Sequence, residues 1–329
     1  RGANLFVPHP SAATPESIDR YAAALSPDGS QLACGTVGQS AIGLLDVASG
    51  AVRTLARDLT YVDTLQFGPQ GRYLVAMSRD FVVRVFDLEQ RTTREHAGGD
   101  RRPIVCTPAL DRAGEWLAHA DNDEVVVRRL GSGSELHRFQ VSSIPRVLMA
   151  RPRAAGEDPN ELAVGGDDGV VTIWNVAEGR VERTMLGDAS RVVSLGYSGD
   201  GQRLAVATRN LRAYLFDCGD GRQLMTVPGS PTGGSRVQLN RDGSAMLVDG
   251  PRSRARLWTC AAEHSVLDLP GHLASPRWFE LDAAHNLPVP APPTSPICRS
   301  RRLRRLTFKS ALIFGNGSQI NETKRGSIK

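Results

Sequence analysis

The chain has 329 residues and a formal net charge of +5, with 33 Gly, 20 Pro and only 5% aromatic residues. This length can bury a large core, and the abundance of Gly and Pro favours many short strands joined by tight turns. No apolar run reaches about 18 residues, which excludes an ordinary membrane-spanning helix.

The positive charge is concentrated at the C-terminal end. Residues 297–329 hold nine Lys and Arg against one Glu, a net +8, so the other 296 residues carry −3. The body of the chain therefore has no overall charge that would attract nucleic acid. One interpretation of the basic cluster Arg299–Arg305 is an arm for RNA, DNA or an acidic membrane, but no aromatic residues alternate with it. We favour a disordered extension or a mispredicted coding end for this tail.

Residues 1–20 are rich in Pro, Ser and Ala and are interpreted as an N-terminal arm. Its only strand-like piece, Asn4–Val7, is either part of a loose arm or a strand that closes a sheet elsewhere. No charged-then-apolar leader follows Arg1, so we expect no signal peptide.

From Tyr21 onward a four-residue turn followed by an apolar strand recurs. The first copy is Ser26-Pro27-Asp28-Gly29 before Gln31–Cys34, which is good β-turn chemistry. The turn glycines are Gly29, Gly71, Gly114, Gly201 and Gly243. Their spacing indicates a repeat of about 42 residues, with one copy hidden near Gly156–Asn160.

A second marker follows each turn, namely a short strand that ends in an aromatic residue and an acid. The best copies are Asp80–Asp87 and Asp168–Asn175, and weaker ones run over Asp123–Leu130 and Asn210–Asp217. Another turn and a fourth strand come next, so each unit has four strands. The units are predicted at residues 21–61, 62–102, 103–144, 145–188, 189–231 and 232–270. No segment shows helical periodicity with caps, so the predicted class is all-β.

This period, the glycine turn and the Trp-Asp-like strand end resemble the WD40-repeat family of β-propellers. The resemblance covers residues 21–270 and implies four-stranded antiparallel blades stacked around an axis. The family's Gly-His is absent from the six units and occurs only at Gly271-His272. The family's turn aspartate corresponds to Asp80, Asp123 and Asp168, with Asn210 in the fifth unit, and these four are predicted to be structural turn residues.

Closure of the ring is the open point of this prediction. Trp278–Leu281 could begin a seventh blade, but the Pro-rich stretch that follows cannot supply ladder donors at its prolines. We expect a propeller over 21–285 with six legible blades and an incomplete seventh, and a Pro-rich then basic tail over 286–329. Closure with six blades and truncation of a longer chain are the alternatives.

No motif for catalysis, metal or cofactor is found. The five cysteines lie far apart and form no C-x-x-C pair, and the seven histidines form no ligand pair. Acids crowd at Asp121–Glu124 and at Asp167-Asp168, where a catalytic or calcium site is conceivable. A structural role in the repeat's own turns is the stronger interpretation, so we expect no cofactor and no enzyme.

The resemblance implies instead a binding surface on the loops of one propeller face. The residues just before the turn aspartate, or its equivalent, are Arg79, Asn122, Asp167 and Arg209, and we predict that they contact partner proteins. The sequence thus predicts a non-catalytic scaffold, cytoplasmic or nuclear, that is part of a larger protein or complex. A propeller hydrolase or lactonase with an axial metal, and a nucleic-acid-associated protein that binds through its tail, are the alternatives.

Overall fold

The structure is a computed structural model that describes residues 22–36, 41–59, 61–97, 106–152, 160–228, 236–249, 255–260 and 266–269. Within these ranges the regular secondary structure is entirely β, with 24 strands and no helix. The strands form six sheets of four, and neighbouring strands in each sheet are antiparallel and consecutive in sequence. The predicted all-β fold of four-stranded units is confirmed.

We call each sheet a blade and number the blades in chain order. Blade 1 comprises β1 (Ala23–Leu25), β2 (Gln31–Thr36), β3 (Ala41–Asp46) and β4 (Val52–Ala56). Blade 2 comprises β5 (Val62–Phe67), β6 (Tyr73–Ser78), β7 (Val82–Asp87) and β8 (Thr92–Ala97). Blade 3 comprises β9 (Ala109–Leu110), β10 (Trp116–Asp121), β11 (Glu124–Arg129) and β12 (Glu135–Gln140).

The three remaining blades follow the same plan. Blade 4 comprises β13 (Pro145–Ala150), β14 (Glu161–Gly166), β15 (Val170–Asn175) and β16 (Arg180–Leu186). Blade 5 comprises β17 (Val192–Tyr197), β18 (Arg203–Thr208), β19 (Arg212–Asp217) and β20 (Gln223–Pro228). Blade 6 comprises β21 (Val237–Leu239), β22 (Ala245–Asp249), β23 (Ala255–Thr259) and β24 (Val266–Leu269).

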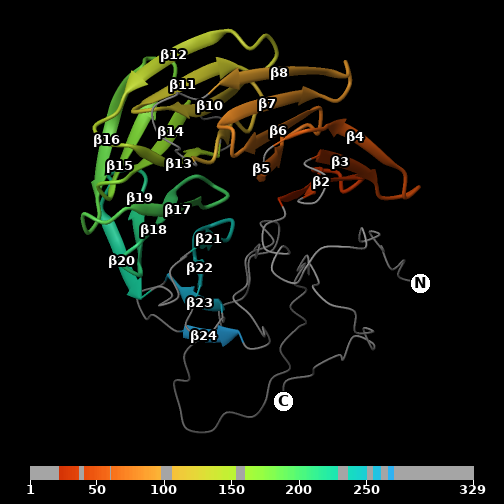
Figure 1. The fold of residues 1–329 in the computed structure, drawn as a ribbon. Coiled ribbons are helices and arrows are strands. Elements are labelled where there is room, and N and C mark those ends of the chain that lie inside the picture. Colours follow the sequence, from red (N-terminus) through yellow and green to blue (C-terminus); the bar gives the residue numbers. More distant parts are fainter. Residues whose placement is uncertain are drawn as a thin grey trace, which may run out of the picture.

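The blades stand side by side around a common centre (Figure 1). The first strands of successive blades contact one another, as β13 does with β17 and β17 with β21. The fourth strands, such as β12, β16 and β20, lie on the outer edge (Figure 1). This is the arrangement of a β-propeller, in which each blade buries the faces of its neighbours.

The recurring glycine turn joins the first two strands of a blade. All five of the glycines that define the repeat have a positive φ, between 67° and 74°. In the first copy the Gly29 amide donates to the Ser26 carbonyl at 2.9 Å, and the Ser26 hydroxyl donates to Asp28 at 2.6 Å. A residue with a Cβ resists this left-handed backbone, which explains why glycine returns at each copy. The sixth copy, near Gly156–Asn160, lies outside the described residues except for Asn160.

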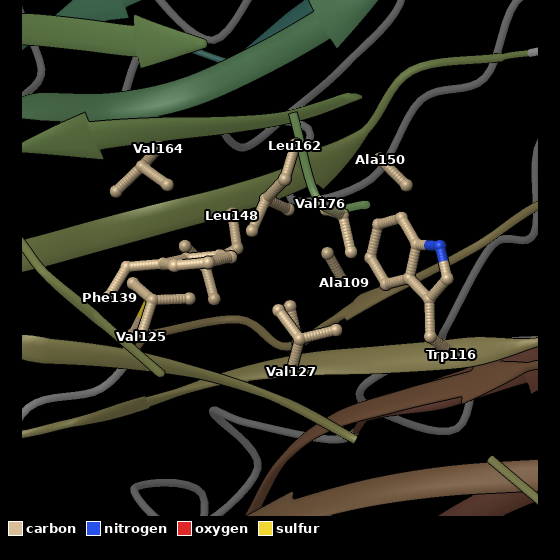
Figure 2. Packing of buried hydrophobic residues seen from close by; sticks show 12 residues of the cluster. Ala109, Trp116, Val125, Val127, Phe139, Leu148, Ala150, Leu162, Val164 and Val176 are labelled. Atoms are coloured by element: carbon tan, nitrogen blue, oxygen red, sulfur yellow. The ribbon is translucent and has the colours of Figure 1, made fainter. Parts of the chain in front are cut away.

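The core lies between the blades. Every residue of β6 is buried, because this inner strand is covered on both faces. Between blades 3 and 4, Trp116, Phe139 and Leu162 belong to one apolar cluster (Figure 2). The Phe139 ring stacks on Trp174 of blade 4 with centroids 4.7 Å apart. Burying each large apolar side chain contributes about 1.5–3 kcal/mol, so contacts between blades supply much of the stability.

Several predicted features lie outside the described residues. They are the N-terminal arm over 1–20, the strand expected at Trp278–Leu281 and the tail over 286–329. Where the structure does describe the chain, it has no helix that is long and apolar enough to cross a membrane.

Candidate binding surface at the inner rim

The turn between the second and third strands lies beside the loop that leads into the first strand. In blades 2, 4 and 5 a backbone amide in this turn donates to the carbonyl of the residue that precedes the first strand. The pairs are Arg79 with Tyr61 at 2.8 Å, Asp167 with Ile144 at 3.0 Å and Arg209 with Arg191 at 2.9 Å. Three of the four positions predicted from the sequence are therefore equivalent in space.

A third residue joins each of these pairs. The pairing of the first strand with the second shifts register between Val62 and Thr64, between Pro145 and Val147, and between Val192 and Ser194. Such a bulge turns the skipped side chain away from its place in the ladder. The skipped residues are Asp63, Arg146 and Val193. We call the residue before the first strand, the bulge residue and the turn residue the rim triad of a blade.

The rim triad of blade 2 is Tyr61, Asp63 and Arg79. The Arg79 guanidinium lies over the Tyr61 ring, 5.0 Å from its centroid, and its Nε is 3.5 Å from Asp63 Oδ2. Tyr61 is 50% exposed and the Arg79 side chain 39% exposed. An aromatic ring and an arginine held together in solvent have the composition of an interface hot spot.

In blade 4 the charges are reversed. The bulge residue is Arg146 and the turn residue is Asp167, and Arg146 Nε donates to Asp167 Oδ1 at 3.0 Å. Arg191 of blade 5 also donates through its Nε to the same oxygen. Hydrogen bonding to Arg146, and then to Arg191, lowers the pKa of Asp167, so this carboxylate is ionised at neutral pH. One carboxylate thus holds two guanidinium groups from neighbouring blades.

The rim triad of blade 5 consists of Arg191, Val193 and Arg209. Because the bulge residue is apolar, Arg209 has no carboxylate opposite it. Arg209 is exposed, and its guanidinium makes no hydrogen bond or ion pair with any residue that the structure describes.

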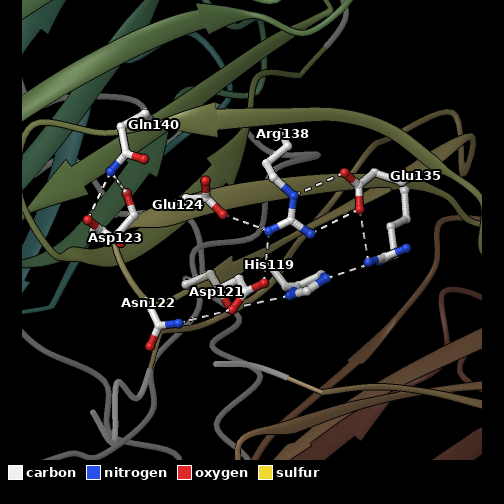
Figure 3. A network of polar contacts seen from close by, with 10 residues as sticks. His119, Asp121, Asn122, Asp123, Glu124, Glu135, Arg138 and Gln140 are labelled. Atoms are coloured by element: carbon white, nitrogen blue, oxygen red, sulfur yellow. Dashed lines mark hydrogen bonds and ion pairs between the residues drawn. The ribbon is translucent and has the colours of Figure 1, made fainter. Parts of the chain in front are cut away.

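Asn122 does not share this position. Asp121 pairs directly with Glu124, so the turn of blade 3 has two residues where blade 2 has three, and Asn122 takes a φ of 58°. The neighbouring acids form a polar network in which Arg138 contacts Asp121 and Glu124 (Figure 3). The shorter hairpin gives blade 3 a different turn from those of blades 2, 4 and 5.

The residues predicted to hold the turns behave differently from blade to blade. Asp80 Oδ1 accepts the Val82 amide at 3.1 Å, and Asp168 Oδ1 accepts the Val170 amide at 3.1 Å. Asp123, in the shorter turn, instead accepts the side chain of Gln140 at 2.9 Å. Asn210 occupies the fifth copy of the turn.

Sequence reasoning missed six members of the rim triads, which are Tyr61, Asp63, Ile144, Arg146, Arg191 and Val193. They lie just before or inside the first strand, where the sequence shows neither the bulge nor the carbonyl contact. Aligning blades 2 and 5 on Gly71 and Gly201 would have placed Tyr61 and Arg191 in one column, but it would not have shown that this column meets the turn residues.

No family model matches the chain. It is 26% identical over 157 residues to an uncharacterized WD repeat-containing protein from Synechocystis, which covers 47% of this chain and 43% of that protein. It is 24% identical over 110 residues to transcription factor unc-37 of Caenorhabditis elegans, covering 33% of this chain and 18% of the relative. It is also 24% identical over 253 residues to transducin beta-like protein 3 of Bos taurus, covering 71% of this chain and 30% of the relative. The matched part spans less than half the length of each of these relatives.

Among solved structures, a chain in the crystal structure of the mitotic checkpoint complex superposes with a TM-score of 0.63 at 18% sequence identity. The match covers 82% of this chain and 90% of that chain.

The fold that the described residues form is a β-propeller of four-stranded antiparallel blades. The resemblance to WD40-repeat propellers seen in the sequence is confirmed by a WD repeat-containing relative and a transducin beta-like relative, and the solved structure confirms the fold.

Proposed function

We propose that this protein is a non-catalytic scaffold that binds other proteins through the rim triads of blades 2, 4 and 5. The observation that carries the proposal is the exposed pairing of Tyr61 with Arg79. Tyr61 keeps half of its surface in solvent although the Arg79 guanidinium lies over its ring, so apolar area remains for a partner to bury. A partner that buries this pair would gain both apolar area and charged hydrogen bonds.

The rim is also rigid, which favours binding. Each turn is tied to the loop before the first strand by a backbone hydrogen bond, and the bulge residue is fixed by the adjacent ladder. A loop backbone that is already ordered loses little entropy when a partner binds. The relatives are consistent with such a role, since transducin beta-like protein 3 and the checkpoint-complex chain are similar to this chain in sequence or fold.

The proposal extends to the setting of the protein. We place the scaffold in a larger protein or complex, in the cytoplasm or the nucleus. The four described cysteines are free, and burial raises the pKa of the Cys106 thiol to about 12. Free, unreactive thiols agree with a reducing compartment. No observation favours the axial-metal enzyme, because the described residues contain no cluster of three or more His, Cys, Asp or Glu that could hold a metal ion.

A pull-down with charge-reversed variants tests the proposal. Arg79→Glu combined with Arg209→Glu should release partners that bind the wild-type protein, with a loss of affinity of about 30-fold or more at a hot spot. The matched control is Arg180→Glu with Arg222→Glu, since both arginines are exposed and follow the opposite, third-to-fourth-strand turns. If the rim variant keeps every partner that the control keeps, the rim is not the binding surface.

A further inference from the structure

We propose that Arg146, Arg191 and Arg209 form a receptor for a phosphorylated side chain in the partner protein. This inference rests on the proposed function and names the chemistry that one part of the rim recognises. We call these three residues the arginine cluster.

The arginine cluster is held in place by one carboxylate. Arg146 and Arg191 both use their Nε to donate to Asp167 Oδ1. Among the described residues the terminal amino groups of these two arginines have no hydrogen-bond partner, and the two side chains are 19% and 36% exposed. Asp167 therefore orients the two guanidinium groups while their remaining donors stay available to a ligand.

Arg209 is the third arginine of the cluster, and its backbone lies beside that of Arg191. Its backbone amide donates to the Arg191 carbonyl at 2.9 Å, so the two residues are adjacent at the ends of β18 and β17. Its side chain is exposed and makes no ion pair with a described residue. Arg146 and Arg191 thus share one carboxylate, and the exposed side chain of Arg209 starts from the backbone beside Arg191.

Two other carboxylates lie close to the cluster, but the structure gives them other partners. Asp168 Oδ1 accepts the Val170 amide at 3.1 Å, and Asp188 Oδ2 accepts the Thr208 hydroxyl at 3.2 Å. They reduce the net charge of this part of the rim without using the donors of the arginines. The cluster therefore recognises an anion through aimed hydrogen bonds more than through long-range attraction.

The number of donors indicates phosphate and not a carboxylate. A carboxylate has two oxygens and is commonly bound by one bidentate arginine, as Asp87 is by Arg72 in this protein. A phosphorylated serine or threonine offers three oxygens and a charge of about −1.5 to −2, which matches several guanidinium groups. Arginine clusters are a general means of recognising phosphorylated segments.

The rest of the chain favours a single phosphate over a polyanion. Residues 1–296 carry a net charge of −3, which disfavours the many backbone contacts that nucleic acid needs. The rim triad of blade 2 adds an aromatic ring and a further arginine on the same rim. A protein segment can use both features, whereas free phosphate can use only the arginine cluster.

Binding to degenerate peptide libraries tests the inference. The probes are three fluorescent libraries with a central phosphoserine, serine or aspartate and random flanking residues, applied to the full chain. We expect the immobilised protein to retain the phosphoserine library and to release the other two. Arg191→Gln and Arg209→Gln should each lower this retention by about tenfold or more, the usual effect of losing a charged hydrogen bond. The control variant Arg222→Gln, on an exposed residue of the opposite turn, should leave retention unchanged.

The outcomes separate this inference from the proposed function. Equal retention of the aspartate and phosphoserine libraries, or retention that survives Arg209→Gln, would overturn the phosphate receptor. Arg209→Gln removes no hydrogen bond or ion pair between described residues, so it tests binding with little effect on folding, and thermal melts check this for each variant. If phosphate recognition fails while the Arg79→Glu and Arg209→Glu variant still loses its protein partners, the scaffold role stands and only the phosphate chemistry is wrong.

Discussion

The buried ion pair between Arg151 and Glu161 offers the sharpest test of what holds the blades together. Arg151 Nη1 lies 3.0 Å from Glu161 Oε2, and both side chains are only 9% exposed. Arg151 Nε also donates to the Gly201 carbonyl of the next blade at 2.8 Å. The pair thus links blade 4 to blade 5 through groups that have little access to water.

Replacing Glu161 by Gln removes the charge and keeps the shape. The Arg151 guanidinium then stays buried without a counter-ion, and such a change costs about 3–5 kcal/mol. Because the Gln oxygen still accepts one hydrogen bond, we expect the lower end, about 3 kcal/mol. With an unfolding entropy of about 2.1 cal per mol per K per residue over roughly 250 folded residues, this lowers Tm by about 6 °C.

The assay is thermal and urea unfolding of Glu161→Gln beside a matched control, Glu178→Gln. Glu178 also pairs with an arginine, Arg180, but its side chain is 53% exposed. An exposed pair contributes about 0–1 kcal/mol, so the control should lower Tm by no more than about 2 °C. Equal effects of the two substitutions would refute the argument that burial makes the Arg151 pair costly to break.

Two further predictions concern pH and backbone strain. Burial lowers the pKa of His119 to about 4, below its unfolded value of 6.5. The unfolded chain therefore binds a proton more readily than the folded chain, and the free energy of unfolding falls as pH drops from 6.5 toward 4. At pH 5 the loss is about 2 kcal/mol, and urea midpoints at pH 7.5 and pH 5 should show a smaller difference in His119→Gln than in the wild type. Gly169→Ala should destabilise the protein more than Gly29→Ala. Both glycines have a positive φ, but a Cβ at Gly169 would lie 2.6 Å from the Ser190 amide nitrogen, whereas a Cβ at Gly29 would meet nothing within 4 Å. Equal urea midpoints for the two alanine variants would contradict the steric part of this prediction.

The repeat could be determined from the sequence because its signals are local. The turn glycine must adopt a backbone conformation that other residues resist, and apolar and polar residues alternate in the short strand after it. The spacing of these signals along the chain therefore indicates the length of the repeat and the strands within it. The same reasoning placed Arg79, Asp167 and Arg209 in equivalent turns. It also placed Asn122 with them, because the strand register that makes the turn of blade 3 one residue shorter cannot be recognised from the sequence.

The tertiary structure alone decided what surrounds those turn residues. Tyr61 and Asp63 are far from Arg79 in sequence, and Arg191 meets Asp167 across two blades, so no local pattern connects them. The bulges in β5, β13 and β17 depend on the register in which each of these strands pairs with the second strand of its blade, and the local sequence does not show that register. The sequence by itself therefore determined the frame of the propeller, and the folded chain decided which charges face one another on its rim.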